Sequence, residues 1–137
     1  MPDDLQILLI DDNAADRALV VALLSQALET ARIWEIDGAL EFAEALGRHP
    51  WSVAIGERRL GWADGEALLR TVKQQHPMCR TILFATEAPE DLGTFGNQGS
   101  IDVYVRKEST GFLRLPELLR ESVSEPDLAP SSWRSPL

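Results

Sequence analysis

Short runs of apolar residues alternate along this chain with segments of helical periodicity. The runs are nearly unbroken, which is typical of strands that are buried on both faces of a sheet. Between them, apolar residues recur three and four positions apart, as in the stripe from Leu19 to Leu28, which indicates helices that bury one side. The pattern predicts five strands, each followed by a helix, at Leu5–Ile10, Ile33–Ile36, Val53–Ile55, Ile82–Ala85 and Ile101–Val105.

Capping residues support the helices of this pattern. Asp37 and Asp64 stand where helices are expected to begin, and an aspartate side chain there accepts hydrogen bonds from unpaired N–H groups. The last helix is expected over residues 115 to 124, with Pro116 in its first turn. Five such units predict the α/β class, in which a parallel sheet carries helices on both faces and binds ligands at the carboxyl ends of its strands.

The fourth helix is expected to be short or irregular. Its segment contains Gly93, Gly96 and Gly99, and each glycine inside a helix costs about 1 kcal/mol relative to alanine. Beyond Glu125 the chain has three prolines and three serines without periodicity, which is typical of a tail or linker. We therefore expect one folded domain over residues 1–124 and a flexible segment over residues 125–137.

Composition narrows the classes of partner. The chain has 137 residues, of which 45% are apolar and 26% charged, as in one globular domain. Its net charge of −9 argues against direct binding of nucleic acid or of an anionic membrane surface. The first residues lack the basic region of a signal peptide, and no apolar stretch approaches the ~18 residues of a membrane span. We expect a cytoplasmic protein.

Polar residues collect where the predicted strands end. Asp11 and Asp12 follow the first strand, Glu57 the third, Thr86 the fourth and Lys107 the fifth. Each residue alone is also explained by helix capping or by solvation, but together they describe a site. Carboxylates ~5 Å apart repel by about 3 kcal/mol at an effective dielectric near 20, so the cluster needs a cation or a compensating side chain. Oxygen ligands of this kind suit Mg²⁺.

Four segments of the chain resemble the receiver domains of two-component response regulators. They are "ILLIDDNAADR", "LGWADGEALL", "ILFATE" and "DVYVRK", and the resemblance covers residues 5 to 124. It implies a flavodoxin-like (βα)5 fold, a doubly wound parallel sheet with strand order 2-1-3-4-5. It also implies a non-enzymatic role in phosphorelay signalling, with a histidine kinase or another signalling protein as partner. In the family, dimers and output domains dock on the face of the fourth helix, fifth strand and fifth helix, so a homodimer through that face is implied.

The resemblance also implies roles for single residues. Asp12 would bind Mg²⁺ directly, and Asp11 would bind it through water. Thr86 and Lys107 would contact the phosphoryl oxygens. Thr86 and Tyr104 match the hydroxyl and the aromatic residue that move together when receivers are phosphorylated, which changes the docking face.

The acceptor position departs from the family. Counting back eight residues from Gly65, which is the family's spacing, gives Glu57 in place of the acceptor aspartate. The extra methylene moves the carboxylate by more than ~1 Å, and misplacement on that order can cost ~100-fold in a positioned reaction. Gly61 and Glu108 stand where the family often has prolines. These departures predict an atypical receiver, or pseudo-receiver, without efficient phosphorylation.

Two interpretations of an unphosphorylated pocket stay open. Glu57 reaches further than aspartate, so it could pair with Lys107 or Thr86 and imitate the phosphorylated state. Alternatively, Arg58 or Arg59 could replace the metal ion, because a guanidinium pairs well with carboxylates.

Two further functions are kept as alternatives. In the first, Glu57 is a slow phosphoacceptor, with Mg²⁺ bound by Asp11, Asp12, Glu57 and the backbone carbonyl of Arg59. In the second, the chain is a flavodoxin-like protein that binds a flavin or a nucleotide. The second is disfavoured because the acidic segment after the first strand contains no glycine-rich phosphate loop.

Overall fold

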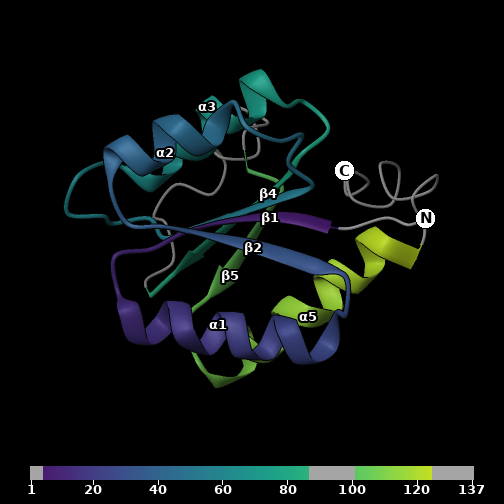
Figure 1. Ribbon diagram of the computed structural model, residues 1–137. Helices are drawn as coiled ribbons and strands as arrows, with labels where there is room; N and C mark the ends of the chain where they lie inside the picture. The colour runs from purple at the N-terminus through teal and green to yellow at the C-terminus, as the bar shows by residue number, and fades with distance from the viewer. Residues whose placement is uncertain (1–4, 87–100, 125–137) are drawn as a thin grey trace.

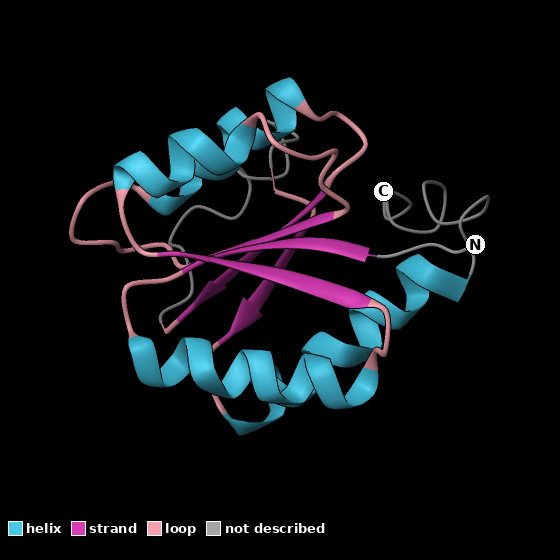
Figure 2. Ribbon diagram, in the orientation of Figure 1, coloured by secondary structure: helices cyan, strands magenta, loops and turns pink. Residues whose placement is uncertain are grey.

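The computed structural model describes residues 5–86 and 101–124, and it confirms the predicted α/β fold (Figure 1). Five strands form one sheet in the order β2-β1-β3-β4-β5, and all neighbouring strands are parallel. Figure 2 shows this sheet between two layers of helices. The elements are β1 (Leu5–Ile10), α1 (Ala14–Ala27), β2 (Ala31–Ile36), α2 (Ala39–Leu46), β3 (Val53–Gly56), α3 (Gly65–Gln75), β4 (Arg80–Ala85), β5 (Val103–Arg106) and α5 (Ser109–Ser124).

The core lies on both faces of the sheet. Helices α1 and α5 cover one face, and α2 and α3 cover the other (Figure 1). Successive side chains of a strand point to opposite faces, so Ile7 and Leu9 pack with α1 and α5. Leu8 and Ile10 pack with α2 and α3. Burial on both faces explains why the apolar runs are unbroken in the sequence.

Strand β4 begins two residues before the predicted apolar run. Its first residues, Arg80 and Thr81, are polar but only 4% and 0% exposed. Arg80 donates to the carbonyl of Leu118 in α5, and the Thr81 hydroxyl donates to the carboxylate of Asp102. Because these side chains find partners inside the fold, their polarity does not end the strand.

Two helix starts were wrongly predicted. Helix α5 begins at Ser109, so Pro116 lies inside the helix instead of in its first turn. Tertiary packing accounts for the earlier start, because the Phe112 ring packs edge-on against Phe84 at a centroid distance of 4.9 Å. Helix α2 is capped by Gly38 and not by Asp37, which donates its N–H to a downstream glutamate.

The predicted irregular fourth helix and the predicted tail lie outside the described residues. Among the helices that the structure describes, none is long and apolar enough to cross a bilayer.

Candidate functional site: an acidic pocket around Lys107

The register of the sheet places Asp11 and Glu57 side by side. Ile10 and Gly56 are partners across β1 and β3, and the N–H of Glu57 donates to the carbonyl of Ile10 at 2.9 Å. Gly65 fixes the other side of Glu57, since a Cβ atom at position 65 would lie 1.8 Å from the Glu57 carbonyl oxygen. This close approach gives the spacing of eight residues between Glu57 and Gly65 a physical reason.

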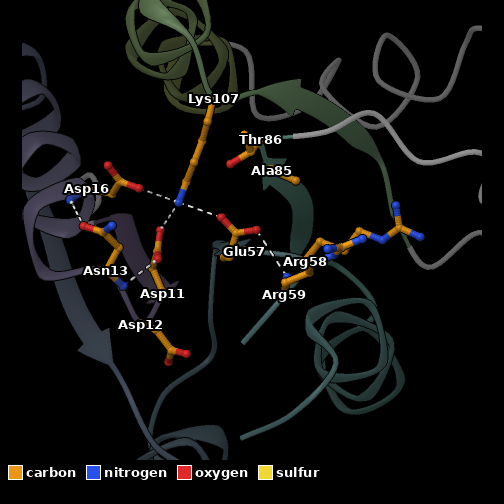
Figure 3. Close-up of a pocket in the computed structure, with 10 residues that line it drawn as sticks. All are labelled: Asp11, Asp12, Asn13, Asp16, Glu57, Arg58, Arg59, Ala85, Thr86 and Lys107. Carbon is orange, nitrogen blue, oxygen red and sulfur yellow. Dashed lines mark hydrogen bonds and ion pairs between the residues drawn. The ribbon is translucent and has the colours of Figure 1, made fainter. Parts of the chain in front are cut away.

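The carboxyl edge of the sheet forms a pocket, as the fold predicts (Figure 3). It has a volume of about 320 Å³, and every residue predicted at a strand end lines it. Four of its lining side chains are carboxylates, which would repel the phosphate groups of a flavin or nucleotide. The lining residues are Asp11, Asp12, Asn13, Asp16, Glu57, Arg58, Arg59, Ala85, Thr86 and Lys107.

The ammonium group of Lys107 contacts three carboxylates at once (Figure 3). Its Nζ lies 2.8 Å from Asp11 Oδ2, 2.7 Å from Asp16 Oδ2 and 2.6 Å from Glu57 Oε1. The side chains of Lys107, Asp11 and Glu57 are only 7%, 3% and 11% exposed. At these distances and with this burial, the ion pairs are weakly screened by solvent.

Burial and charge act in opposite directions on the groups of this cluster. Burial alone would lower the pKa of Lys107, but hydrogen bonds to three carboxylates outweigh it and hold the pKa above its ordinary value. Burial raises the pKa of Asp11, although hydrogen bonds from Lys107 and from the N–H of Asn13 oppose the rise. The lysine is therefore firmly protonated, and one positive charge is shared among three acids.

The Asp12 carboxylate points away from Lys107 (Figure 3). Its Oδ1 accepts a hydrogen bond from the indole N–H of Trp62 at 2.8 Å, and its Oδ2 accepts one from the N–H of Gly61. Asp12 was expected to bind the metal ion directly, but both of its carboxylate oxygens accept hydrogen bonds from the loop between β3 and α3.

The side chains of Arg58 and Arg59 extend away from the carboxylates (Figure 3). Arg59 approaches Glu57 through its backbone, since its N–H donates to Glu57 Oε2 at 3.2 Å. The ammonium of Lys107 contacts the other oxygen of Glu57 at 2.6 Å. Replacement of a metal ion by either arginine stays a prediction.

The two predicted switch residues lie on neighbouring strands, Thr86 just after β4 and Tyr104 within β5. Thr86 is exposed and lines the pocket. Tyr104 lies on β5 and packs against the core beneath α2 and α3. Its hydroxyl is buried without a hydrogen-bond partner among the described residues, and this burial raises the pKa of the phenol. Their movement on phosphorylation stays a prediction.

The residues of the pocket, as arranged, do not fit a Mg²⁺ ion. Asp11 and Glu57 converge on the ammonium of Lys107, and Asp12 is directed to the loop. Within residues 5–86 and 101–124, no group of three histidine, cysteine or acidic side chains is disposed to hold a metal ion. A Mg²⁺ ion would need three oxygen ligands to leave their present partners.

The sequence interpretation missed Asp16 and the role of Trp62. Asp16 lies in the first turn of α1, whose cap Asn13 accepts a hydrogen bond from the Asp16 N–H. An acid three residues after a helix cap indicates that Asp16 lies in a first helical turn, but it does not indicate the contact with Lys107. Nothing in the sequence around Trp62 indicates that its indole reaches Asp12.

Comparison with known proteins agrees with this fold. The chain is 32% identical over 94 residues to the DNA-binding transcriptional regulator NtrC of Escherichia coli strain K12. The match covers 68% of the chain but 20% of NtrC, so the chain spans about a fifth of that relative's length. No protein-family model matches the sequence.

Solved structures are similar over nearly the whole described chain. The signal receiver domain of an HD domain-containing protein from Pseudomonas fluorescens Pf-5 is 25% identical, with a TM-score of 0.69 over 88% of this chain and 99% of that one. The chain has the fold of a response-regulator receiver domain. A response regulator from Burkholderia pseudomallei, solved with a phosphorylated aspartic acid, a calcium ion and citrate, is 15% identical with a TM-score of 0.69 over 90% of this chain and 75% of that one. The chain is thus similar in sequence to part of NtrC and similar in fold to receiver domains.

Proposed function

We propose that residues 1–124 form a receiver-type signalling domain that acts by protein–protein interaction, without efficient phosphorylation. The observation that supports this proposal is the contact of 2.6 Å between Glu57 and Lys107 at the acceptor position. One carboxylate oxygen of Glu57, Oε1, contacts the buried ammonium of Lys107, and the other, Oε2, accepts a hydrogen bond from the Arg59 N–H. Without a metal ion, an approaching phosphoryl group would also meet the negative charge of the surrounding carboxylates.

The longer reach of glutamate gives the pocket a fixed arrangement. In phosphorylated receivers the lysine contacts the phosphoryl group, and in this chain it contacts the Glu57 carboxylate. Lys107 directly follows β5, which carries Tyr104. We infer that the ion pair holds β5 and α5 in one arrangement, which a cytoplasmic partner, a histidine kinase or another signalling protein, recognises. The same face could accept a second copy of the chain.

Phosphorylation of the purified chain tests this proposal. The chain is incubated with Mg²⁺ and acetyl phosphate, and its intact mass is measured. We expect no added phosphoryl group, as in the Glu57→Gln variant, which lacks the acceptor carboxylate and supplies the background. A stoichiometric phosphoryl group on Glu57 would overturn the proposal.

A slow phosphoacceptor is the second candidate function. The observation that favours it is that Asp11, Thr86 and Lys107 line the same pocket as Glu57, as the chemistry of a receiver requires. Labelling that depends on Mg²⁺, occurs on Glu57 and is absent from the Glu57→Gln variant would select this function over the first.

A further inference from the structure

The loop between β3 and α3 is closed by its own backbone. The N–H of Gly65 donates to the carbonyl of Arg58 at 2.9 Å, and the N–H of Leu60 donates to the carbonyl of Ala63 at 3.3 Å. An antiparallel bridge joins the two sides of the loop between these bonds. Gly61 and Trp62 therefore lie at the tip of a narrow, hairpin-like turn.

Both tip residues donate a hydrogen bond to Asp12. The indole N–H of Trp62 donates to Oδ1, and the backbone N–H of Gly61 donates to Oδ2. The Trp62 ring is half-buried and packs on the core beneath α2 and α3, as Leu60 and Leu68 do. Because packing fixes the ring, the indole N–H is directed at Asp12 before any ligand arrives.

The hydrogen bond from position 61 requires a residue with a backbone N–H. Proline has no N–H group to donate, so a proline at this position would leave Asp12 Oδ2 without its loop partner. The approach is also close, because a Cβ atom at position 61 would lie 3.3 Å from Asp12 Oδ2, and the Asp12 side chain would have to shift slightly. Glycine thus provides both the donor and the close approach.

We propose that Gly61 and Trp62 form a clasp that holds the Asp12 carboxylate at the β3–α3 loop and away from Lys107, so that Asp12 anchors the loop instead of binding a cation. Trp62 is then a positioning residue that sets the affinity of the pocket for divalent cations. The significance of the clasp for signalling rests on the proposed function, whereas the hydrogen bonds of Asp12 do not depend on it.

Competition for the Asp12 oxygens gives the clasp its effect. Asp12 can coordinate a cation in the pocket only after it releases the N–H groups of Gly61 and Trp62. Hydrogen bonds to a charged carboxylate are stronger than those between neutral groups. Loss of one such bond corresponds to about tenfold or more in an equilibrium constant. Removal of the indole donor should therefore raise the affinity for Mg²⁺ by about that factor.

Indole N–H signals in a ¹H–¹⁵N NMR spectrum test the clasp without any phosphorylation. Asp12→Ala removes the acceptor, so the Trp62 indole signal should move and its hydrogen exchange should accelerate. The Trp51 indole, which donates to the Ala45 carbonyl at 3.1 Å, is the internal control and should stay in place. A Trp62 signal with unchanged position and exchange would overturn the proposal.

A Mg²⁺ titration by calorimetry tests the proposed consequence. Trp62→Phe keeps an aromatic ring on the core but removes the donor, and we expect its affinity for Mg²⁺ to exceed that of the wild type by about tenfold or more. Trp34→Phe, which changes a tryptophan remote from the pocket, should bind as the wild type does. Equal affinity of Trp62→Phe and the wild type would overturn the proposal. Neither measurement depends on whether Glu57 is phosphorylated, so failure of the clasp and failure of the proposed function are distinguishable.

Discussion

Lys107 carries one positive charge against three carboxylates whose oxygens lie within 2.8 Å of its Nζ. Two of these carboxylates, Asp11 and Glu57, are almost fully buried with it. Removal of one partner from a buried ion pair leaves an uncompensated charge, which is why such pairs are costly to break even where they add little net stability. At the scale of residues, the pocket therefore depends on Lys107.

A double-mutant cycle over Glu57 and Lys107 measures their coupling. We expect Lys107→Met to destabilise the fold by about 3 kcal/mol, because it leaves buried carboxylates without a counter-charge. Adding Glu57→Gln to this variant should reduce the loss, because it removes one of those carboxylates. Urea unfolding of the two single variants and the double variant gives the coupling energy. The pair of Lys73 and Asp102, whose side chains are 21% and 22% exposed, is the matched control and should couple more weakly. A Glu57–Lys107 coupling below about 0.5 kcal/mol, as in exposed pairs, would contradict this account.

Cys79 gives a prediction for alkaline pH. The residue is 0% exposed, and burial raises the pKa of its thiol from 9.0 to about 12. Because the unfolded thiol ionises first, the folded state loses stability as the pH rises from 9.0 through about 12. The free energy of unfolding of the wild type should fall over this range relative to that of the Cys79→Ala variant. Parallel pH profiles of the two proteins would show that the thiol remains accessible to solvent.

Some site residues could be predicted from the sequence, and others could not. Asp11 and Glu57 follow apolar runs, so the parallel sheet alone brings them to one edge. Asp16 and Trp62 reach partners that are 91 and 50 positions away in the chain. The contact of Asp16 depends on the angle of α1, and the contact of Trp62 depends on the shape of the turn before α3. The local pattern of apolar and polar residues indicates neither of these features.

At the scale of elements, buried strands were predicted well and polar or irregular starts were not. The bounds of β1 were predicted correctly because its residues are buried and apolar except for Gln6, and acidic residues flank the strand on both sides. The prediction for β4 omitted Arg80 and Thr81, because the sequence does not show that a polar residue has a hydrogen-bond partner inside the fold. The start of α5 was placed too late because the contact between Phe112 and Phe84 is tertiary.

The junction of β3 and α3 depends on glycine at position 65. Gly65→Ala would place a Cβ atom 1.8 Å from the Glu57 carbonyl oxygen, so the backbone must move. We expect this variant to lose about 2 kcal/mol or more in the free energy of unfolding, measured in urea. Gly47→Ala is the matched control, because a Cβ atom there meets nothing within 4 Å. Equal effects of the two substitutions would refute the close approach.

At the scale of the whole molecule, the chain has the receiver fold, with Glu57 where the family's spacing predicts the acceptor aspartate. The sheet order and the two helix layers match receivers at 25% identity or less. Such folds tolerate changes in their sites, so the fold alone does not establish phosphotransfer. The contact of Glu57 with Lys107, which lies directly after β5, is the observation that links the altered pocket to the proposed docking face.

Hydrogen exchange over the whole chain, followed by mass spectrometry, tests the central claim most directly. The chain is compared before and after treatment with Mg²⁺ and acetyl phosphate, and Lys107→Met provides the reference for a pocket without the ion pair. The account predicts unchanged exchange in β4, β5 and α5 of the treated wild type, with faster exchange there in the Lys107→Met variant. A coordinated change across β4, β5 and α5 of the treated wild type, accompanied by a phosphoryl group on Glu57, would contradict it.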